Sequence, residues 1–152
     1  MRWQCASFTE LSPVELYRML ALRCAIFVVE QDCAYQDLDG LDSDSRVQHL
    51  NLWRQGHLLA TARLLGPGVQ ASDQVWIGRV AVAVEARGQG LARELMQYAL
   101  AEVQARWPGY PVRLSAQTYV RDFYRSLGFV PLGNEYLEDG IPHQEMELRC
   151  SA

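Results

Sequence analysis

The sequence predicts an α+β fold built around one central βαβ unit, and three observations support this prediction. The 152 residues are enough for one domain of common size. Hydrophobic residues make up 49% of the chain and charged residues 21%, close to the globular average, which argues against disorder. Short apolar segments of strand character stand on both sides of a long segment of helical period between Gly88 and Trp107.

The N-terminal part predicts a strand followed by a helix. Residues 2–8 alternate loosely and are expected to form an edge strand. The helix that follows has a clear start, because Ser12 is an N-cap, Pro13 occupies the first helical position and Glu15 completes a capping box. Its apolar stripe extends to about Arg23.

Two further segments connect this helix to the sheet. Residues 25–31 are short and apolar and are expected to be either helical or extended. They lead into an acidic loop at residues 32–45. Strands joined by the tight turn Gln55-Gly56 follow at residues 48–54 and 57–65.

The C-terminal half contains the βαβ unit and a last hairpin. A β-branched run predicts a strand at residues 75–84, and the strand beyond the long helix is expected at residues 112–116. A short helical stripe then ends at Gly128, which is suited to a C-cap. The final hairpin is predicted with arms near residues 129–132 and 144–149.

The composition excludes several classes of protein. The net charge of −4 argues against nucleic-acid binding, which needs a basic surface for the phosphates. All 14 basic residues are arginine, which excludes a Walker-type phosphate loop and lysine Schiff-base chemistry. We find no bilayer-spanning run, secretory segment or metal-ligand spacing, and expect a cytoplasmic protein with no metal and no membrane partner. Four cysteines are expected to be reduced: Cys5, Cys24, Cys33 and Cys150.

A glycine-containing turn after the strand at residues 75–84 carries the main functional signal. It opens the long helix, whose first backbone N–H groups lack partners within the helix and lie at the positive end of its dipole. Gly88 and Gly90 have no side chains, so a pyrophosphate can approach these N–H groups. A dinucleotide-binding fingerprint does not fit, because Arg93 replaces the third Gly or Ala and residues 108–112 contain no acid for a ribose.

Two patterns resemble those of the GCN5-related N-acetyltransferase (GNAT) superfamily. The first is Arg-Gly-Gln-Gly-Leu-Ala at residues 87–92, which matches the signature Gln/Arg-x-x-Gly-x-Gly/Ala. The second is Phe123-Tyr124 followed by Gly128-Phe129. Further blocks resemble the ElaA-like group of this superfamily: residues 22–33, 35–40 and 138–143, and Met146.

The resemblance implies a GNAT fold over residues 7–149 as a single domain. In this fold a mixed, mostly antiparallel central sheet lies between helices (α/β/α), and a splayed βαβ core binds an acyl-CoA. The resemblance further implies acetyl-CoA as co-substrate, with Tyr124 as the general acid that protonates the departing thiolate. The residues expected to bind coenzyme A are Val80, Ala81, Val82, Arg87, Gly88, Gln89, Gly90, Leu91, Ala92, Arg93, Gln117 and Tyr124.

The general base is left open by the sequence. Acyl transfer to an amine needs a base, because a lysine-like amine is almost fully protonated at pH 7. Glu30, His49 and His143 are the candidates. Glu30 ends an apolar run, where burial would raise its pKa. A structural role is the alternative for His49 and for His143.

The loop after Glu30 suggests the charge of the acceptor. Its carboxylates have no basic residue among them, so they form either a solvated loop or a negative rim that attracts a cation. The spacing does not fit an EF-hand. The six carboxylates are Glu30, Asp32, Asp37, Asp39, Asp42 and Asp44.

Taken with the resemblance, these residues predict an acetyl-CoA-dependent N-acetyltransferase. Its acceptor would be a small cationic amine or a protein or peptide amine, which attacks directly in a ternary complex. The alternatives are a non-catalytic module that binds coenzyme A, or an acyltransferase that uses another acyl donor or a hydroxyl acceptor. The sequence leaves monomer and homodimer open.

Overall fold

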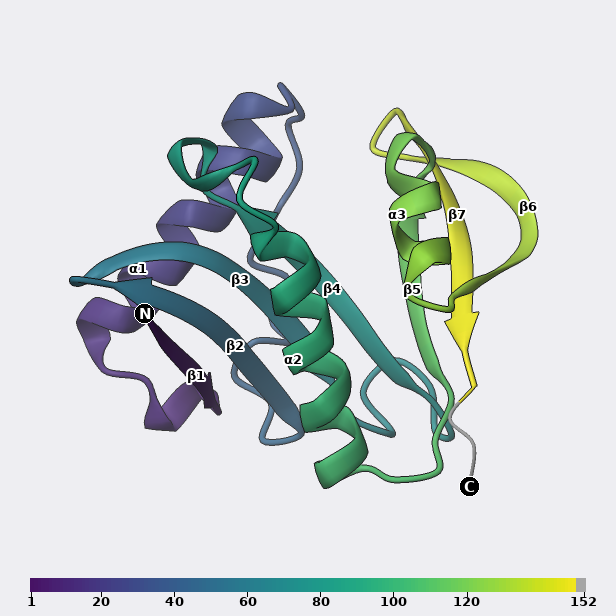
Figure 1. The fold of residues 1–152 in the computed structure, drawn as a ribbon, viewed down its shortest axis with the longest axis horizontal. Coiled ribbons are helices and arrows are strands. Elements are labelled where there is room, and N and C mark those ends of the chain that lie inside the picture. Colours follow the sequence, from purple (N-terminus) through teal and green to yellow (C-terminus); the bar gives the residue numbers. More distant parts are fainter. Residues whose placement is uncertain (150–152) are drawn as a thin grey trace.

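Seven strands form one mixed sheet in the computed structural model, which describes residues 1–149 (Figure 1). Their spatial order is β1-β2-β3-β4-β5-β7-β6, and every neighbouring pair is antiparallel except β4 and β5. This confirms the predicted α+β class with a mixed, mostly antiparallel sheet. The strands are β1 (Arg2–Ala6), β2 (Val47–Arg54), β3 (His57–Leu65), β4 (Val75–Val82), β5 (Val112–Gln117), β6 (Val130–Glu138) and β7 (Ile141–Leu148).

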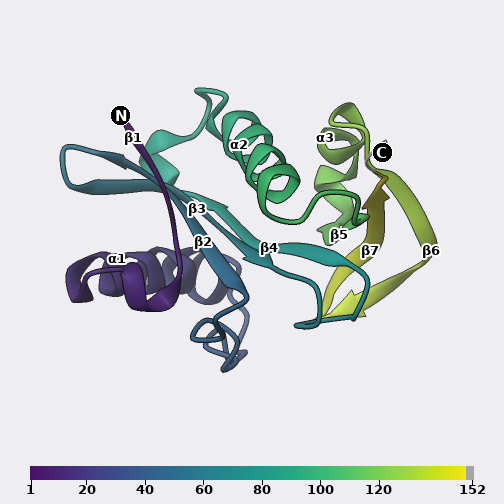
Figure 2. The ribbon, with the colours of Figure 1, turned by 90° about the horizontal axis from the view of Figure 1, so that it is seen from below.

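Helices cover both faces of the sheet. Figure 2 shows α1 on one face and α2 and α3 on the other. The π-helical segment η2 continues α1 without a break, which settles the helical-or-extended alternative for residues 25–31. The helices are α1 (Pro13–Arg23), η2 (Cys24–Glu30), α2 (Leu91–Arg106) and α3 (Arg121–Ser126).

The capping box predicted at the start of α1 is confirmed. The backbone N–H of Glu15 donates to Ser12 Oγ over 3.1 Å, and the Ser12 N–H donates to Glu15 Oε1 over 2.9 Å. These bonds satisfy two of the donors that a helix start leaves open. They fix where the chain enters α1, and therefore where η2 ends beside the sheet.

Two apolar clusters hold the layers together. The larger cluster lies between α2 and the sheet, where the α2 stripe is buried against β2, β3 and β4. The smaller cluster lies beneath α1. The α2 residues of the first are Leu91, Leu95, Met96, Ala99 and Val103, and the second comprises Ala6, Leu11, Met19, Trp53 and Leu58.

The sheet splays between β4 and β5. These parallel strands pair only at Val75 with Val112 and at Trp76 with Arg113. Beyond those pairs the strands diverge, as Figure 1 shows, and β5 continues with β7 instead. The splayed βαβ core that the sequence implied is therefore present, and the side of β4 that faces β5 has free backbone groups from Ile77 onward.

A bulge interrupts β4 in the middle. Between the pairs Arg63–Gly78 and Thr61–Ala81, β3 advances by two residues and β4 by three. The extra residue is accommodated by Arg79, whose φ of +52° lies in the left-handed region. For a residue other than glycine this conformation costs about 1–3 kcal/mol and persists only where the surroundings hold it.

Several predicted boundaries differ from the structure. The strand expected at residues 75–84 ends at Val82, because the Ala86 N–H donates to the Ala83 carbonyl in a 3₁₀ turn, Val84–Ala86. The final hairpin is longer than expected and turns at Asp139-Gly140, where both residues have positive φ. The expected edge strand ends at Ala6 rather than at residue 8.

The described residues can be compared with the expectations about membrane spans and cysteines. No helix within residues 1–149 is long and apolar enough to cross a membrane. Cys5, Cys24 and Cys33 are free thiols, and Cys150 lies outside the described residues.

Candidate active site

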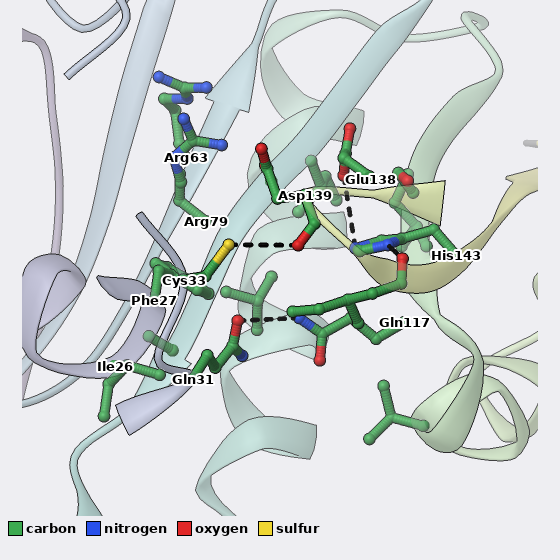
Figure 3. A pocket seen from close by; sticks show the side chains of 18 of the residues that line it. Ile26, Phe27, Gln31, Cys33, Arg63, Arg79, Gln117, Glu138, Asp139 and His143 are labelled. Atoms are coloured by element: carbon green, nitrogen blue, oxygen red, sulfur yellow. Dashed lines mark hydrogen bonds and ion pairs between the residues drawn. The ribbon is translucent and has the colours of Figure 1, made fainter. Parts of the chain in front are cut away.

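A cavity of about 880 Å³ opens where β4 and β5 diverge (Figure 3). Its walls come from β4, β5, η2, α3 and the turn between β6 and β7. Most residues that the sequence proposed for the site line this cavity: Glu30, Val80, Ala81, Val82, Arg87, Ala92, Gln117, Tyr124 and His143.

A second hollow of about 220 Å³ lies at the N-terminus of α2. Gly88 and Gly90 line it with φ of +79° and +75°, and a Cβ built on either glycine meets no atom within 4 Å. Leu91 and Arg93 also line this hollow, whereas Gln89 lines neither space. The open space beside unpartnered N–H groups suits an anion.

Arg87 joins the two spaces. Its guanidinium donates to both carboxylate oxygens of Glu30, over 2.7 and 2.6 Å, and its Nε donates to the Val82 carbonyl over 3.3 Å. The hydrogen bonds from Arg87 lower the pKa of the Glu30 carboxyl, which is not buried. The expectation that burial raises the pKa of Glu30 is therefore wrong.

Arg93 ties the glycine turn to α3. Its Nη2 donates to Ser126 Oγ over 2.8 Å, and its guanidinium lies 5.5 Å from the centre of the Phe123 ring. These contacts hold the first turn of α2 against the helix that carries Tyr124.

Tyr124 is almost fully buried on α3, with 8% of its surface exposed. Its ring makes edge contacts with Phe123 and Phe129, at centroid distances of 5.1 and 6.1 Å. Burial raises the pKa of the Tyr124 phenol to about 12. The hydroxyl therefore stays protonated at neutral pH and is available as a proton donor in the cavity.

Two hydrogen bonds cross the cavity, as the dashed lines in Figure 3 show. Gln117 Nε2 on β5 donates to Gln31 Oε1 at the end of η2 over 3.2 Å. Cys33 Sγ donates to the backbone carbonyl of Asp139 over 3.3 Å. Together with the Glu30–Arg87 pair, they tie residues 30–33 to both halves of the splayed sheet.

His143 lies on β7 directly opposite Gln117 of β5. Its Nδ1 is 2.7 Å from the Ile141 carbonyl, which can only accept, so Nδ1 carries the proton. In the neutral ring Nε2 then has a lone pair, and it lies 3.4 Å from Glu138 Oε2, a carboxylate oxygen that pairs with Nε2 only once Nε2 carries a proton. Tyr136 stacks on the imidazole at 6.1 Å between ring centres. This tautomer makes Nε2 a possible proton acceptor at the cavity wall.

His49 is in a different environment. It is fully buried on β2 and is not among the residues that line the cavity. Its Nε2 bonds to the Asp42 carbonyl over 3.0 Å, while Nδ1 has no hydrogen-bond partner among residues 1–149. Burial lowers the pKa of His49. The structure therefore favours the structural alternative for this histidine.

The acidic loop is not an unpaired negative rim. Five of its six carboxylates are paired with arginine side chains, which come from elsewhere in the fold for all but one of them. A solvated loop and a negative rim were the two alternatives because no basic residue lies between Glu30 and Asp44, but arginines outside that segment pair with its carboxylates. The pairs are Glu30–Arg87, Asp37–Arg23, Asp39–Arg63, Asp42–Arg23 and Asp44–Arg46.

Three of these carboxylates and three arginines close into a ring of alternating charge, which we call the arginine–aspartate ring. It connects the end of α1, the loop, β3 and β4. Its six ion pairs, in order around the ring, are Arg23–Asp37 at 2.9 Å, Asp37–Arg79 at 2.8 Å, Arg79–Asp39 at 3.4 Å, Asp39–Arg63 at 2.9 Å, Arg63–Asp42 at 3.2 Å and Asp42–Arg23 at 2.8 Å.

The ring carries three positive and three negative side chains, and most of them are buried. Burial is the largest single effect on the pKa of Asp39 and raises it, but the hydrogen bonds from Arg63 and from the Leu41 N–H, together with the charges of Arg63 and Arg79, bring that pKa down to about 2. Burial likewise raises the pKa of Asp42, but the hydrogen bonds from Arg23 and the charges of Arg23 and Arg63 together lower it. Three guanidinium groups face the three carboxylates, so the ring as a whole adds no net negative charge to the loop.

Several residues of the cavity wall were not predicted from the sequence. Gln31, Cys33 and Tyr119 line it, as do the carboxylates Glu138 and Asp139. The Asp139-Gly140 pair between apolar segments is a hairpin signal that could have placed these two carboxylates at a turn. No local signal marks Gln31 or Cys33, because their partners lie on other strands.

The comparisons with known proteins agree with this geometry. An acetyltransferase (GNAT) domain model matches residues 26–150. Protein ElaA of Escherichia coli K12 is 43% identical over 143 residues, which cover 94% of this chain and 93% of ElaA.

Solved structures agree as well. A crystal structure described as an acyl-CoA N-acyltransferase from Pseudomonas aeruginosa is 47% identical with a TM-score of 0.92, covering 96% of this chain and 97% of that one. The crystal structure of E. coli ElaA is 42% identical with a TM-score of 0.91 and the same coverage. The chain therefore belongs to the GNAT superfamily of acyltransferases, in its ElaA-like group.

Proposed function

We propose that the protein is an acetyl-CoA-dependent N-acetyltransferase that transfers the acetyl group to an amine by direct attack in a ternary complex. One observation carries the proposal. A single cavity, in the gap between β4 and β5, is lined by Arg87 of the glycine turn, by the buried hydroxyl-bearing Tyr124 and by His143. Arg87 also lines the hollow at Gly88 and Gly90, so an anion site adjoins the space that holds a proton donor and a proton acceptor.

The residues present fit coenzyme A. The open space at Gly88 and Gly90 would take the diphosphate on backbone N–H groups at the start of α2. The unpaired side of β4, through Val80, Ala81 and Val82, would bond to the amide groups of the pantetheine arm. Acetyl-CoA supplies a thioester carbonyl when it is bound.

His143 and Tyr124 support the two proton transfers of this reaction. A lysine-like amine is protonated at pH 7, and its deprotonation costs about 4–5 kcal/mol. His143 Nε2 would receive that proton, directly or through a water, because Nδ1 is already committed to the Ile141 carbonyl. The Tyr124 hydroxyl, with its pKa raised to about 12, would donate its proton to the thiolate that leaves.

The acceptor is proposed to be a cationic amine. The negative charges that would attract this amine lie at the β6–β7 turn, and not in the acidic loop. Glu138 lies next to His143 with no arginine partner among residues 1–149, and Asp139 follows it at the cavity wall. A positively charged group in addition to the reacting amine would be favoured there.

A thiol-release assay with acetyl-CoA and a panel of small amines, polyamines, amino sugars and peptides tests the proposal. Acetylated amine must appear in step with free coenzyme A. Binding of coenzyme A without release for any amine would instead favour a non-catalytic module. Faster release of coenzyme A from propionyl-CoA or a longer acyl-CoA would show that acetyl-CoA is not the preferred donor. Acylation only of hydroxyl compounds would overturn the amine acceptor.

A further inference from the structure

The bulge at Arg79 has no local cause in the sequence. Glycine is the residue that adopts positive φ without strain, and Gly78 stands next to the bulge, but the left-handed conformation falls on Arg79. Val80, which follows, has no partner on β3 and lines the cavity. Contacts elsewhere in the fold must therefore hold this backbone conformation.

The Arg79 side chain supplies these contacts. Its Nε lies 2.8 Å from Asp37 Oδ1, and its Nη2 donates to the Asp37 carbonyl over 3.1 Å. The guanidinium also lies 5.5 Å from the centre of the Tyr35 ring, and Tyr35 itself donates to Asp37 over 2.5 Å. The Arg79 guanidinium is thus held by the Tyr35 ring against its flat face and by Asp37 at its nitrogen atoms.

The ring also holds the other side of the bulge. Arg63 on β3 pairs in register with Gly78, and its guanidinium binds Asp39 through two bonds of 2.9 Å. Arg79 reaches the same carboxylate over 3.4 Å. Strands β3 and β4, whose pairing is interrupted at the bulge, are therefore also joined through Asp39, and the far side of the ring is anchored by the buried Arg23.

We propose that Arg79 is a positioning residue, which acts through the arginine–aspartate ring to hold the β4 bulge and so directs the free backbone groups of Val80 toward the substrates. This inference rests on the proposed acyl transfer for its kinetic effect. The Arg79 side chain lines the cavity, but its guanidinium is engaged by Asp37 and Asp39, and we assign it no contact with the reacting atoms. What matters for the reaction is the left-handed backbone at Arg79, and the ring is the device that maintains it.

Replacing Arg79 by glycine and by alanine separates the backbone from the side chain. Both variants remove the guanidinium and break the ring, but only glycine adopts a φ of +52° without strain. We expect kcat to fall about 100-fold in Arg79→Ala, as for other small misplacements of catalytic groups. Arg79→Gly should keep a kcat at least about ten-fold above that of Arg79→Ala, while thermal unfolding shows similar losses in both.

Two results would overturn the inference. An equally low kcat in Arg79→Gly and Arg79→Ala would mean that the guanidinium acts on the substrates directly. An unchanged kcat in Arg79→Ala would mean that the ring serves stability alone. Arg79→Lys serves as a control, because a single ammonium cannot reproduce the three contacts, and it should resemble Arg79→Ala rather than the wild type.

A second variant covers the case in which these proteins do not fold. Asp39 is the most exposed member of the ring, so Asp39→Asn weakens the ring mildly. We expect hydrogen exchange of the peptide over residues 78–82 to become about ten-fold faster, with β2 unchanged. Unchanged exchange would contradict the role of the ring. Hydrogen exchange needs no turnover, so it tests the ring even if the wild type transfers no acyl group. A wild type without acyl transfer would contradict only the proposed function.

Discussion

The two ends of the cavity are built in different ways. At the proposed donor end, the groups open to a ligand are backbone N–H groups around Gly88 and Gly90, which carry no side chains and line the hollow that shares Arg87 with the main cavity. At the proposed acceptor end, the walls are side chains that bond to one another, such as Gln117 with Gln31 and the members of the arginine–aspartate ring. The donor end comes from one continuous segment, and the acceptor end from segments far apart in the sequence.

This difference separates two kinds of recognition. A backbone site at a helix start can be altered in its side chains with little loss, provided that the glycines remain. A site made of paired side chains depends on each partner, because removing one leaves a buried group without compensation. Variants of the glycine turn should therefore act mainly on coenzyme A affinity, and variants of the paired side chains of the opposite wall mainly on turnover and acceptor choice.

The largest effect is expected from Gly90→Glu. A carboxylate placed at the start of α2 would repel the diphosphate, and we expect coenzyme A affinity to fall about 1,000-fold in calorimetry. Gly109→Glu is a matched control, because Gly109 also has positive φ and open space around its Cβ but lies beyond the end of α2. Equal losses in both variants would show that backbone strain, not the site, is responsible.

Tyr124→Phe comes next and tests whether the donor end also performs chemistry. The ring keeps its edge contacts with Phe123 and Phe129, so the Kd for coenzyme A should barely change. Loss of the proton donor should lower kcat about 100-fold. Tyr98→Phe, on the α2 face that stacks on Trp3, is the control. If kcat in Tyr124→Phe equals that of the wild type, solvent protonates the thiolate and Tyr124 serves packing.

The open helix start at Gly88 and Gly90 could be predicted from the sequence because its cause is local. The spacing of Gly88 and Gly90 after an apolar strand already implies a helix start with open N–H groups, and the capping box at Ser12 was recognised in the same way. Both features depend on residues within one turn of one another. Local sequence patterns therefore sufficed for them.

The acceptor end could not be predicted, because its determinants are pairings across the fold. Asp37 looks like a solvated loop residue until Arg23 and Arg79 are brought to it, 14 and 42 positions away. His49 and His143 both lie on strands, and only the completed sheet shows that His143 faces the cavity while His49 is enclosed. The bulge at Arg79 likewise has no signature of its own.

His143→Asn tests whether His143 accepts a proton from the amine. Asparagine can keep the hydrogen bond to the Ile141 carbonyl but offers no equivalent of Nε2. With a lysine-like amine, kcat/KM should fall about 30-fold, somewhat less than the roughly 100- to 10,000-fold that general acid–base catalysis typically contributes. With a weakly basic amine that is neutral at pH 7, the loss should be less than about three-fold, because no proton needs to be removed first. Equal losses for both amines would assign His143 a structural role.

The smallest effect is expected from Glu30→Gln. Unlike the other variants, it should bind coenzyme A more tightly than the wild type. Glu30 holds Arg87 through two short hydrogen bonds, so the carboxylate competes with the diphosphate for the guanidinium. Arg87 lowers the pKa of Glu30, so the pair is present at neutral pH and is lost only as the pH falls through that lowered pKa. Because both side chains are partly exposed, the pair is weak, and removing the charge should improve coenzyme A affinity only about three- to ten-fold at pH 7.

Glu85→Gln distinguishes competition from a general change of charge. Glu85 is also exposed and acts on Arg87 through charge alone, without a hydrogen bond. If loss of one negative charge were enough, both variants would gain affinity equally, and the gain would vanish at high salt because exposed charges are screened. A gain confined to Glu30→Gln means that the end of η2 and the diphosphate bind the same guanidinium. Coenzyme A would then release residues 30–33 from one of their three ties, which links the donor end to the acceptor end. Weaker binding in Glu30→Gln would instead mean that Glu30 holds Arg87 in the orientation that coenzyme A requires.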